Sequence, residues 1–134
     1  MSNMHQENTS TEPTILVVED DVPLNEAYKT ILQRAGYNVQ TALNGQEALD
    51  AVKEVDPNII LLDLRMPVLD GVGFLTKYNT KAHPGTAVVV FSNYDSHADI
   101  DKAYELGIDR YILKARAAPK DLLALVEGIL EEQD

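Results

Sequence analysis

The chain has 134 residues, of which 45% are hydrophobic and 25% are charged, and this balance is typical of one soluble globular domain. It has no cysteine, which excludes disulfide bonds and thiolate metal sites. Its 22 acidic and 11 basic residues give a formal net charge of −11, and the basic residues are scattered, which argues against direct binding to nucleic acid.

The N-terminal segment and the apolar runs bear on where the protein works. Residues 1–13 are polar and show no apolar periodicity, so they predict a disordered lead-in before one domain over residues 14–134. This lead-in lacks the basic start and apolar stretch of a secretory signal. The apolar runs are far too short to span a membrane. We therefore expect a cytoplasmic protein with no membrane association.

Five short apolar runs predict five β-strands. All but the second are nearly continuous in Val, Ile and Leu, as expected of strands that are covered on both faces. In chain order the runs are residues 15–18, 37–41, 59–62, 87–91 and 111–113.

Amphipathic stretches between these runs predict helices, and each begins with a recognisable signal. Ser96 followed by Asp99 predicts a capping box. Gly36 and Gly107 predict helix ends. The expected first residues are Asp21 with Pro23, Asn44 with Glu47, Asp70 with Gly71, Ser96 with Asp99, and Pro119.

The strict alternation of strand and helix predicts the fold class. Short links between alternating elements favour a parallel sheet with helices on both faces. We expect an α/β fold with a doubly wound, five-stranded parallel sheet in the order 2-1-3-4-5, a flavodoxin-like (βα)5 arrangement.

Chemically active residues follow four of the five runs. In such a sheet the carboxyl ends of the strands meet at one edge, where ligands bind. The second run is followed only by Ala42 and Leu43, which suits an outer strand. The residues that follow the other runs are Glu19, Asp20 and Asp21 after the first, Asp63 after the third, Ser92 after the fourth and Lys114 after the fifth.

This set of side chains predicts a phosphoryl-accepting site that requires a metal ion. Carboxylates about 4 Å apart repel each other by about 4 kcal/mol at an effective dielectric constant near 20, so the cluster needs a cation. Oxygen ligands of this kind suit Mg²⁺. A carboxylate beside such an ion can attack phosphorus and form an acyl phosphate. Asp63 is the candidate nucleophile, and Lys114 and Ser92 are candidates to share the phosphoryl charge.

Four segments, ILVVEDD, LLDLRMPVLDG, VVVFSN and YILKA, resemble the receiver domain of two-component response regulators. The resemblance covers about residues 14–132, and all four segments occur in the family's order. It implies that Asp63 is the phosphoacceptor and that Asp20 is a direct Mg²⁺ ligand. It further implies that Glu19 holds the ion through water or in alternation with Asp20, and that the backbone carbonyl of Arg65 is another ligand.

The resemblance also implies a switch and its partners. Ser92 would hydrogen-bond the phosphoryl group, Lys114 would pair with it, and Tyr111 would reorient together with Ser92. The donor would be a sensor histidine kinase or a histidine phosphotransfer protein. A downstream protein would bind the face of the fourth helix, fifth strand and fifth helix. Such a protein is a signalling module rather than an enzyme, since it catalyses only its own phosphoryl transfer and dephosphorylation, and it would be a monomer or a phosphorylation-linked dimer.

Each of these residues also has a plain structural interpretation. Asp63 could cap a helix, Ser92 could terminate a strand, and Lys114 could be a solvated surface lysine. Tyr111 could be a fixed core residue. For Asp21 the helix-capping interpretation is sufficient by itself. After Leu130 only four residues remain, so we expect output through protein contacts unless the chain is part of a longer regulator.

The sequence departs from the family pattern at two places. Ala115 stands where receivers have a proline in a cis peptide bond, and a cis bond to a non-proline residue costs about 3 kcal/mol. We therefore expect a trans Lys114–Ala115 bond. Arg65 and Tyr94, two residues beyond Asp63 and Ser92, are bulky where the family's side chains flank the path of the hydrolytic water. We expect slow self-dephosphorylation.

Three other functions were weighed against this one. A phosphatase of the haloacid dehalogenase type needs a second Asp two residues after the nucleophile, and that position is Arg65. A flavodoxin-type electron carrier needs a phosphate loop after the first strand, where the carboxylates of the EDDVP segment would repel a phosphate. A receiver that serves as a constitutive interaction module, silent to phosphate, is the nearest alternative, and the intact acidic set argues against it.

Overall fold

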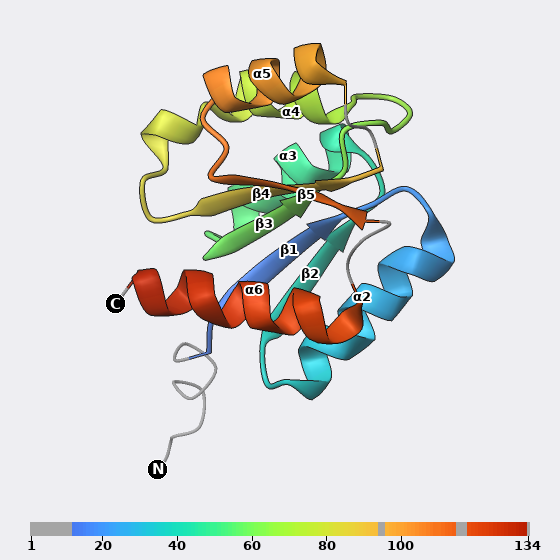
Figure 1. The fold of residues 1–134 in the computed structure, drawn as a ribbon, viewed down its shortest axis with the longest axis vertical. Helices are drawn as coiled ribbons and strands as arrows, with labels where there is room; N and C mark the ends of the chain where they lie inside the picture. The colour runs from blue at the N-terminus through green and yellow to red at the C-terminus, as the bar shows by residue number, and fades with distance from the viewer. Residues whose placement is uncertain (1–11, 94–95, 115–117, 134) are drawn as a thin grey trace.

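A computed structural model describes residues 12–93, 96–114 and 118–133 (Figure 1). Strands and helices alternate along these ranges, as the sequence predicts. In chain order the elements are β1 (Thr14–Val18), α2 (Val22–Arg34), β2 (Asn38–Ala42), α3 (Gly45–Glu54), β3 (Ile59–Leu62), α4 (Gly71–Tyr78), the 3-10 helix η3 (Thr80–Ala82), β4 (Ala87–Ser92), α5 (His97–Glu105), β5 (Arg110–Leu113) and α6 (Pro119–Glu132).

The strands form one parallel sheet in the order β2-β1-β3-β4-β5, which confirms the predicted topology. Val18 at the end of β1 is paired with Ala42 and Leu62, the last residues of its two neighbours. The carboxyl ends of these strands therefore lie level at one edge of the sheet.

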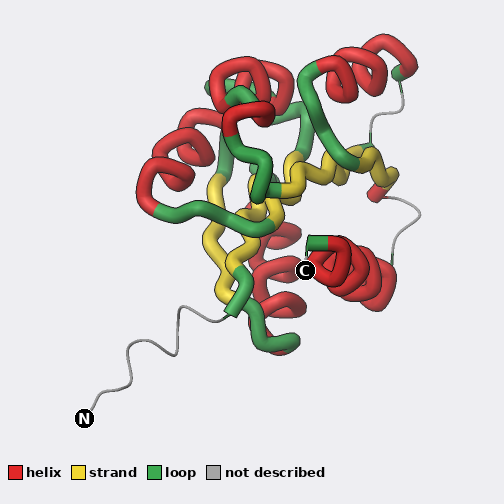
Figure 2. The backbone as a smooth tube through the Cα atoms, turned by 90° about the vertical axis from the view of Figure 1, so that its left-hand side faces the viewer, coloured by secondary structure: helices red, strands yellow, loops and turns green. Residues whose placement is uncertain are grey.

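Helices cover both faces of the sheet, with α2 and α6 on one side and α3, α4 and α5 on the other (Figures 1 and 2). Alternate residues of a strand point to opposite faces. In β1, Leu16 packs into the core beneath α3, α4 and α5, whereas Ile15 packs into the core beneath α2 and α6. This two-sided burial explains the near-continuous apolar runs of the central strands.

The two outer strands are less buried than the three central ones. In β2 the side chains are mostly exposed or half-buried, as expected for an edge. The last run, residues 111–113, was expected to be covered on both faces, but its side chains are only half-buried. Because β5 is the other edge of the sheet, one side of it has no neighbouring strand.

The starts of four helices can be compared with the capping residues predicted for them. The side chains of Asp21, Asn44 and Asp70 accept hydrogen bonds from backbone N–H groups three residues ahead, at 3.1, 2.9 and 2.8 Å, as predicted. The capping box at Ser96 was wrong, because among the described residues the Ser96 side chain makes no capping hydrogen bond. The side chain of Asp99, its expected partner, accepts a hydrogen bond from Arg65 in the loop after β3 instead.

None of the helices in the described ranges combines the length and the apolar character that a membrane crossing requires.

Candidate functional site

Three carboxylates gather at the carboxyl edge of the sheet. Glu19 and Asp20 directly follow β1, and Asp63 directly follows β3. Glu19 is 3% exposed and Asp63 8% exposed, whereas Asp20 is exposed to solvent. One oxygen from each of the three lies within 4.8 Å of the other two. The cluster predicted from the strand ends is therefore present.

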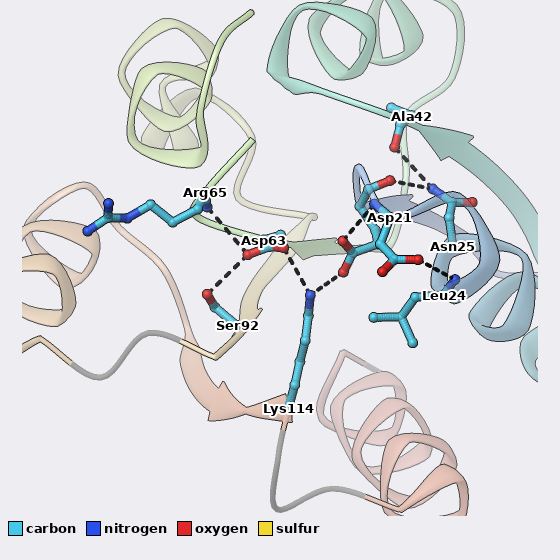
Figure 3. Close-up of polar contacts among 9 residues, drawn as sticks. Asp21, Leu24, Asn25, Ala42, Asp63, Arg65, Ser92 and Lys114 are labelled. Atoms are coloured by element: carbon cyan, nitrogen blue, oxygen red, sulfur yellow. Dashed lines mark hydrogen bonds and ion pairs between the residues drawn. The ribbon is translucent and has the colours of Figure 1, made fainter. Parts of the chain in front are cut away.

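Lys114, which follows β5, joins two of these carboxylates (Figure 3). Its ammonium group donates hydrogen bonds to Asp63 Oδ2 at 2.9 Å and to Glu19 Oε1. The side chains of Lys114 and Asp63 are 9% and 10% exposed, so this ion pair is largely shielded from water. A buried charge without a partner is costly, and here each of the two buried carboxylates has the same cation as a partner.

The second oxygen of Asp63 is also held. Ser92, at the end of β4, is fully buried, and its hydroxyl donates a hydrogen bond to Asp63 Oδ1 at 3.0 Å. The backbone N–H of Arg65 lies 3.4 Å from the same oxygen. Asp63 therefore lies between the Ser92 hydroxyl and the Lys114 ammonium group. The sequence predicted that all three side chains lie at the same edge of the sheet.

Burial and charge shift the pKa of two groups in the site. Burial raises the pKa of the Glu19 carboxyl, and hydrogen bonds from Lys114 and from the Asp21 N–H oppose this only in part. Burial by itself would lower the pKa of Lys114, but its hydrogen bonds to Glu19 and Asp63 outweigh burial and raise it. The two buried carboxylates thus stabilise the positive charge of Lys114 between them.

Asn25, which no sequence motif predicted, supports the backbone at Glu19. It is 2% exposed, and its side-chain amide donates hydrogen bonds to the backbone carbonyls of Glu19 at 3.0 Å and Ala42 at 3.2 Å. It thereby ties the ends of β1 and β2 together. The available signal was its spacing, because Asn25, Tyr28 and Leu32 lie on one face of α2, where a polar residue among inward-facing positions is unusual.

Two of the remaining predicted residues, Arg65 and Tyr111, have described side chains. The Arg65 guanidinium points away from Asp63 (Figure 3). It binds Asp99 of α5 at 3.2 Å. Tyr111 is half-buried beside the core beneath α3, α4 and α5, and its hydroxyl oxygen is buried. Ala115 and Tyr94 lie outside the described residues, so the expectations about the peptide bond and about the Tyr94 side chain stay predictions.

The donor set fits Mg²⁺. Mg²⁺ prefers oxygen ligands at about 2.0–2.1 Å in octahedral geometry and usually takes one or two carboxylates with several waters. One oxygen each of Glu19, Asp20 and Asp63 lies within 4.8 Å of the other two, a spacing that suits one such ion held partly through water, and exposed Asp20 leaves room for water. The excess of negative charge over the single Lys114 ammonium also favours a divalent cation.

Comparisons with known proteins agree with this geometry. The family model of the response regulator receiver domain matches residues 15–127. A DNA-binding response regulator, MtrA of Mycobacterium tuberculosis (strain ATCC 25618 / H37Rv), is 33% identical over 120 residues, which are 90% of this chain and 51% of MtrA. The probable transcriptional regulator ycf27 of Porphyridium aerugineum is 33% identical over 90% of this chain and 49% of its own length. The chain therefore spans about half the length of these curated relatives.

Solved structures of receiver domains share the fold over nearly their full length. A CheY-like response regulator receiver domain protein from Methanospirillum hungatei JF-1 superposes with a TM-score of 0.85 at 31% identity, covering 91% of this chain and 96% of that one. The BeF3-activated DrrB receiver domain gives a TM-score of 0.78 at 28% identity, covering 90% and 98%. With the family model matching most of its length, this chain belongs to the response regulator receiver domain family of two-component systems.

Proposed function

We propose that this receiver is a phosphorylation-dependent switch in which Asp63 accepts a phosphoryl group from a histidine of a sensor kinase or phosphotransfer protein. One observation carries the proposal. The Asp63 carboxylate is held between the Ser92 hydroxyl and the Lys114 ammonium, beside two further carboxylates at the open edge of the sheet. This arrangement places a nucleophile, two donors for phosphoryl oxygens and a cation-attracting cluster within one site.

The transfer step follows from these contacts. A carboxylate oxygen of Asp63 attacks phosphorus, the P–N bond to the donor histidine breaks, and the histidine nitrogen keeps the electron pair. The product is an acyl phosphate on Asp63. Lys114 and Ser92, which now donate to the Asp63 carboxylate, would donate to the oxygens of the attached phosphoryl group.

Mg²⁺ would be held by Asp20, Asp63 and the backbone carbonyl of Arg65, with Glu19 acting through water. When bound, it supplies charge neutralisation for the transferring phosphoryl oxygens. The structure supports Glu19 as an indirect ligand, because one Glu19 oxygen accepts a hydrogen bond from Lys114 and the other accepts one from the Asp21 N–H at 3.1 Å.

The output face would be α5, β5 and α6, the fourth helix, fifth strand and fifth helix of the fold. Ser92 would follow the new phosphoryl group, and Tyr111 would repack beside it. Register places Ser92 in β4 opposite Leu113 of β5, so a movement of the β4 end acts directly on the neighbouring strand. We propose a protein as the direct partner, since 22 acidic against 11 basic residues disfavour nucleic acid.

Acetyl phosphate tests the proposal. The protein is incubated with acetyl phosphate with and without Mg²⁺, and intact-mass spectrometry measures a hydroxylamine-sensitive phosphoryl adduct. We expect an adduct on the wild type only with Mg²⁺, and none on Asp63→Asn. Equal modification of Asp63→Asn, or no Mg²⁺-dependent adduct on the wild type, would contradict the proposal, and the second result would favour a receiver that acts as a constitutive interaction module.

A further inference from the structure

One ion pair connects the phosphoacceptor loop to a helix of the proposed output face. Arg65 lies two residues after Asp63, and its backbone N–H is 3.4 Å from Asp63 Oδ1. Its guanidinium reaches across to Asp99 in the first turn of α5, with Nη2 and Oδ2 3.2 Å apart. The side chain of one residue thus spans from the site to α5, 34 positions further along the chain.

The first turn of α5, residues 97–100, is exposed or half-buried. Ala103 is the buried residue of the helix, and the Ser96 side chain makes no capping hydrogen bond within the described part of the chain. Asp99 stands where an acidic side chain would stabilise the helix start, yet its carboxylate is turned to Arg65. The Arg65–Asp99 pair is therefore one contact between the loop after β3 and the first turn of α5.

We propose that the Arg65–Asp99 pair is a latch that couples phosphorylation of Asp63 to release of α5; this inference rests on the function proposed above. The guanidinium can bind either of two anions, Asp99 in the unphosphorylated protein or the phosphoryl group after transfer. Asp99 is thus a positioning residue that holds Arg65 away from the site. When Arg65 turns to the phosphoryl oxygens, the first turn of α5 loses its tie.

The direction of the exchange follows from the strengths of the two contacts. The Arg65 and Asp99 side chains are 56% and 32% exposed, and exposed ion pairs of this kind are weak. Arginine binds phosphoryl oxygens through charge-assisted, often bidentate hydrogen bonds, which are stronger. Because coupling is reciprocal, removing the Asp99 carboxylate must favour phosphoryl binding as much as phosphoryl binding loosens Asp99.

A double-mutant cycle with beryllofluoride, a stable mimic of the phosphoryl group, tests the latch. Apparent affinity for beryllofluoride is measured at saturating Mg²⁺ for the wild type, Asp99→Asn, Arg65→Gln and the double variant. We expect Asp99→Asn to bind up to about fivefold more tightly than the wild type. In the Arg65→Gln background the same Asp99 change should have no effect, because the guanidinium for which the two anions compete is gone.

Asp101→Asn is the matched control, since it removes the same charge from an exposed position of the same helix. It should leave the affinity within error of the wild type. Equal affinity of Asp99→Asn and wild type, or the same tightening without Arg65, would overturn the latch while leaving the proposed function intact. Failure of the wild type itself to bind beryllofluoride would overturn both. Amide hydrogen exchange should show the first turn of α5 opening faster in Asp99→Asn than in Asp101→Asn.

Discussion

The Lys114 ammonium group is bound by two carboxylates that are themselves almost fully buried, Glu19 and Asp63. In water each of these charges would be solvated, and in the folded protein each depends on the others for compensation. The raised pKa of Lys114 expresses the same dependence, because the charged form of the amine is favoured despite its burial. Removing the lysine therefore leaves two neighbouring buried carboxylates without their shared cation.

We predict that Lys114→Met destabilises the metal-free protein by about 3 kcal/mol, the usual cost of leaving a buried charge unpaired. Mg²⁺ should then stabilise this variant more than it stabilises the wild type, because the ion replaces the missing positive charge beside Glu19 and Asp63. Urea unfolding in EDTA and in Mg²⁺ measures both effects. Lys102→Met, at an exposed position of α5, is the control, and an equal loss in the two variants would contradict the prediction.

At the scale of elements, the loop from β3 to α4 is built by close backbone contacts. The Gly71 N–H donates a hydrogen bond to the Leu64 carbonyl at 2.9 Å, which folds the start of α4 back onto the end of β3. The Gly45 N–H, from the start of α3, donates to the Leu69 carbonyl at 2.7 Å. This loop carries Asp63 and Arg65 at its beginning, so its packing positions the site.

Gly71 has no space for a side chain. A Cβ added there would lie 2.6 Å from the Asp63 carbonyl oxygen and 2.8 Å from the Leu64 Cα, both of which are backbone atoms that cannot step aside. We predict that Gly71→Ala destabilises the protein by about 2 kcal/mol or more and weakens Mg²⁺ binding, because the strain falls on Asp63. Thermal unfolding and a Mg²⁺ titration measure the two effects.

Gly128 in α6 is the matched control for this substitution. A Cβ there would meet nothing within 4 Å, so Gly128→Ala should raise stability by about 0.5–1 kcal/mol through helix propensity alone. A Gly71→Ala protein as stable as the wild type, or one with unchanged Mg²⁺ affinity, would contradict the prediction.

Val68 in the same loop has a backbone conformation that is unfavourable for a β-branched residue. Its φ is 68°, the Leu69 N–H donates to the Pro67 carbonyl across it at 2.7 Å as in a γ-turn, and its side chain is 80% exposed. A β-branched residue at positive φ is strained, whereas asparagine is enriched there. We predict that Val68→Asn stabilises the protein by about 1 kcal/mol, since it relieves strain without removing a buried contact. Urea denaturation measures the change, and a destabilised variant would show that the Val68 side chain supports the loop.

At the scale of the whole molecule, the buried phenols and Lys114 determine how stability depends on alkaline pH. Burial raises the pKa of Tyr28 and of Tyr78 above the ordinary value of 10.0, and the pKa of Lys114 is raised above 10.5. A group whose pKa is higher in the folded state contributes stability that is fully present below its unfolded pKa. That contribution is lost as the pH rises through its folded pKa.

We therefore predict that the free energy of unfolding falls as the pH rises above the ordinary pKa values of these groups, 10.0 and 10.5, because the folded protein retains protons that the unfolded chain releases. Chemical denaturation at constant ionic strength and increasing pH measures the slope. Tyr28→Phe/Tyr78→Phe should flatten it, since two of the responsible groups no longer titrate. A slope that stays the same in this double variant would assign the effect to other groups.

Much of the fold was open to prediction because it rests on local patterns. The strand predicted over residues 59–62 matches β3. The strand predicted over residues 37–41 begins and ends one residue before β2. The caps at Asp21, Asn44 and Asp70 were predictable, since each binds a backbone group three residues away. The capping box at Ser96 was wrong, and for its Asp99 half the reason is that the Asp99 carboxylate binds Arg65, a partner from a distant loop that no local pattern shows.

Local patterns in the chain are enough to predict the order of the sheet and the edge at which Asp63, Asp20, Glu19, Ser92 and Lys114 meet. Apolar periodicity and right-handed crossovers leave little choice in either. The side-chain pairs are known only from the folded protein, as with Lys114 and Glu19 across 95 positions and Arg65 and Asp99 across 34. Such pairings depend on distances of a few ångströms between separate elements, and no local pattern in the chain encodes them.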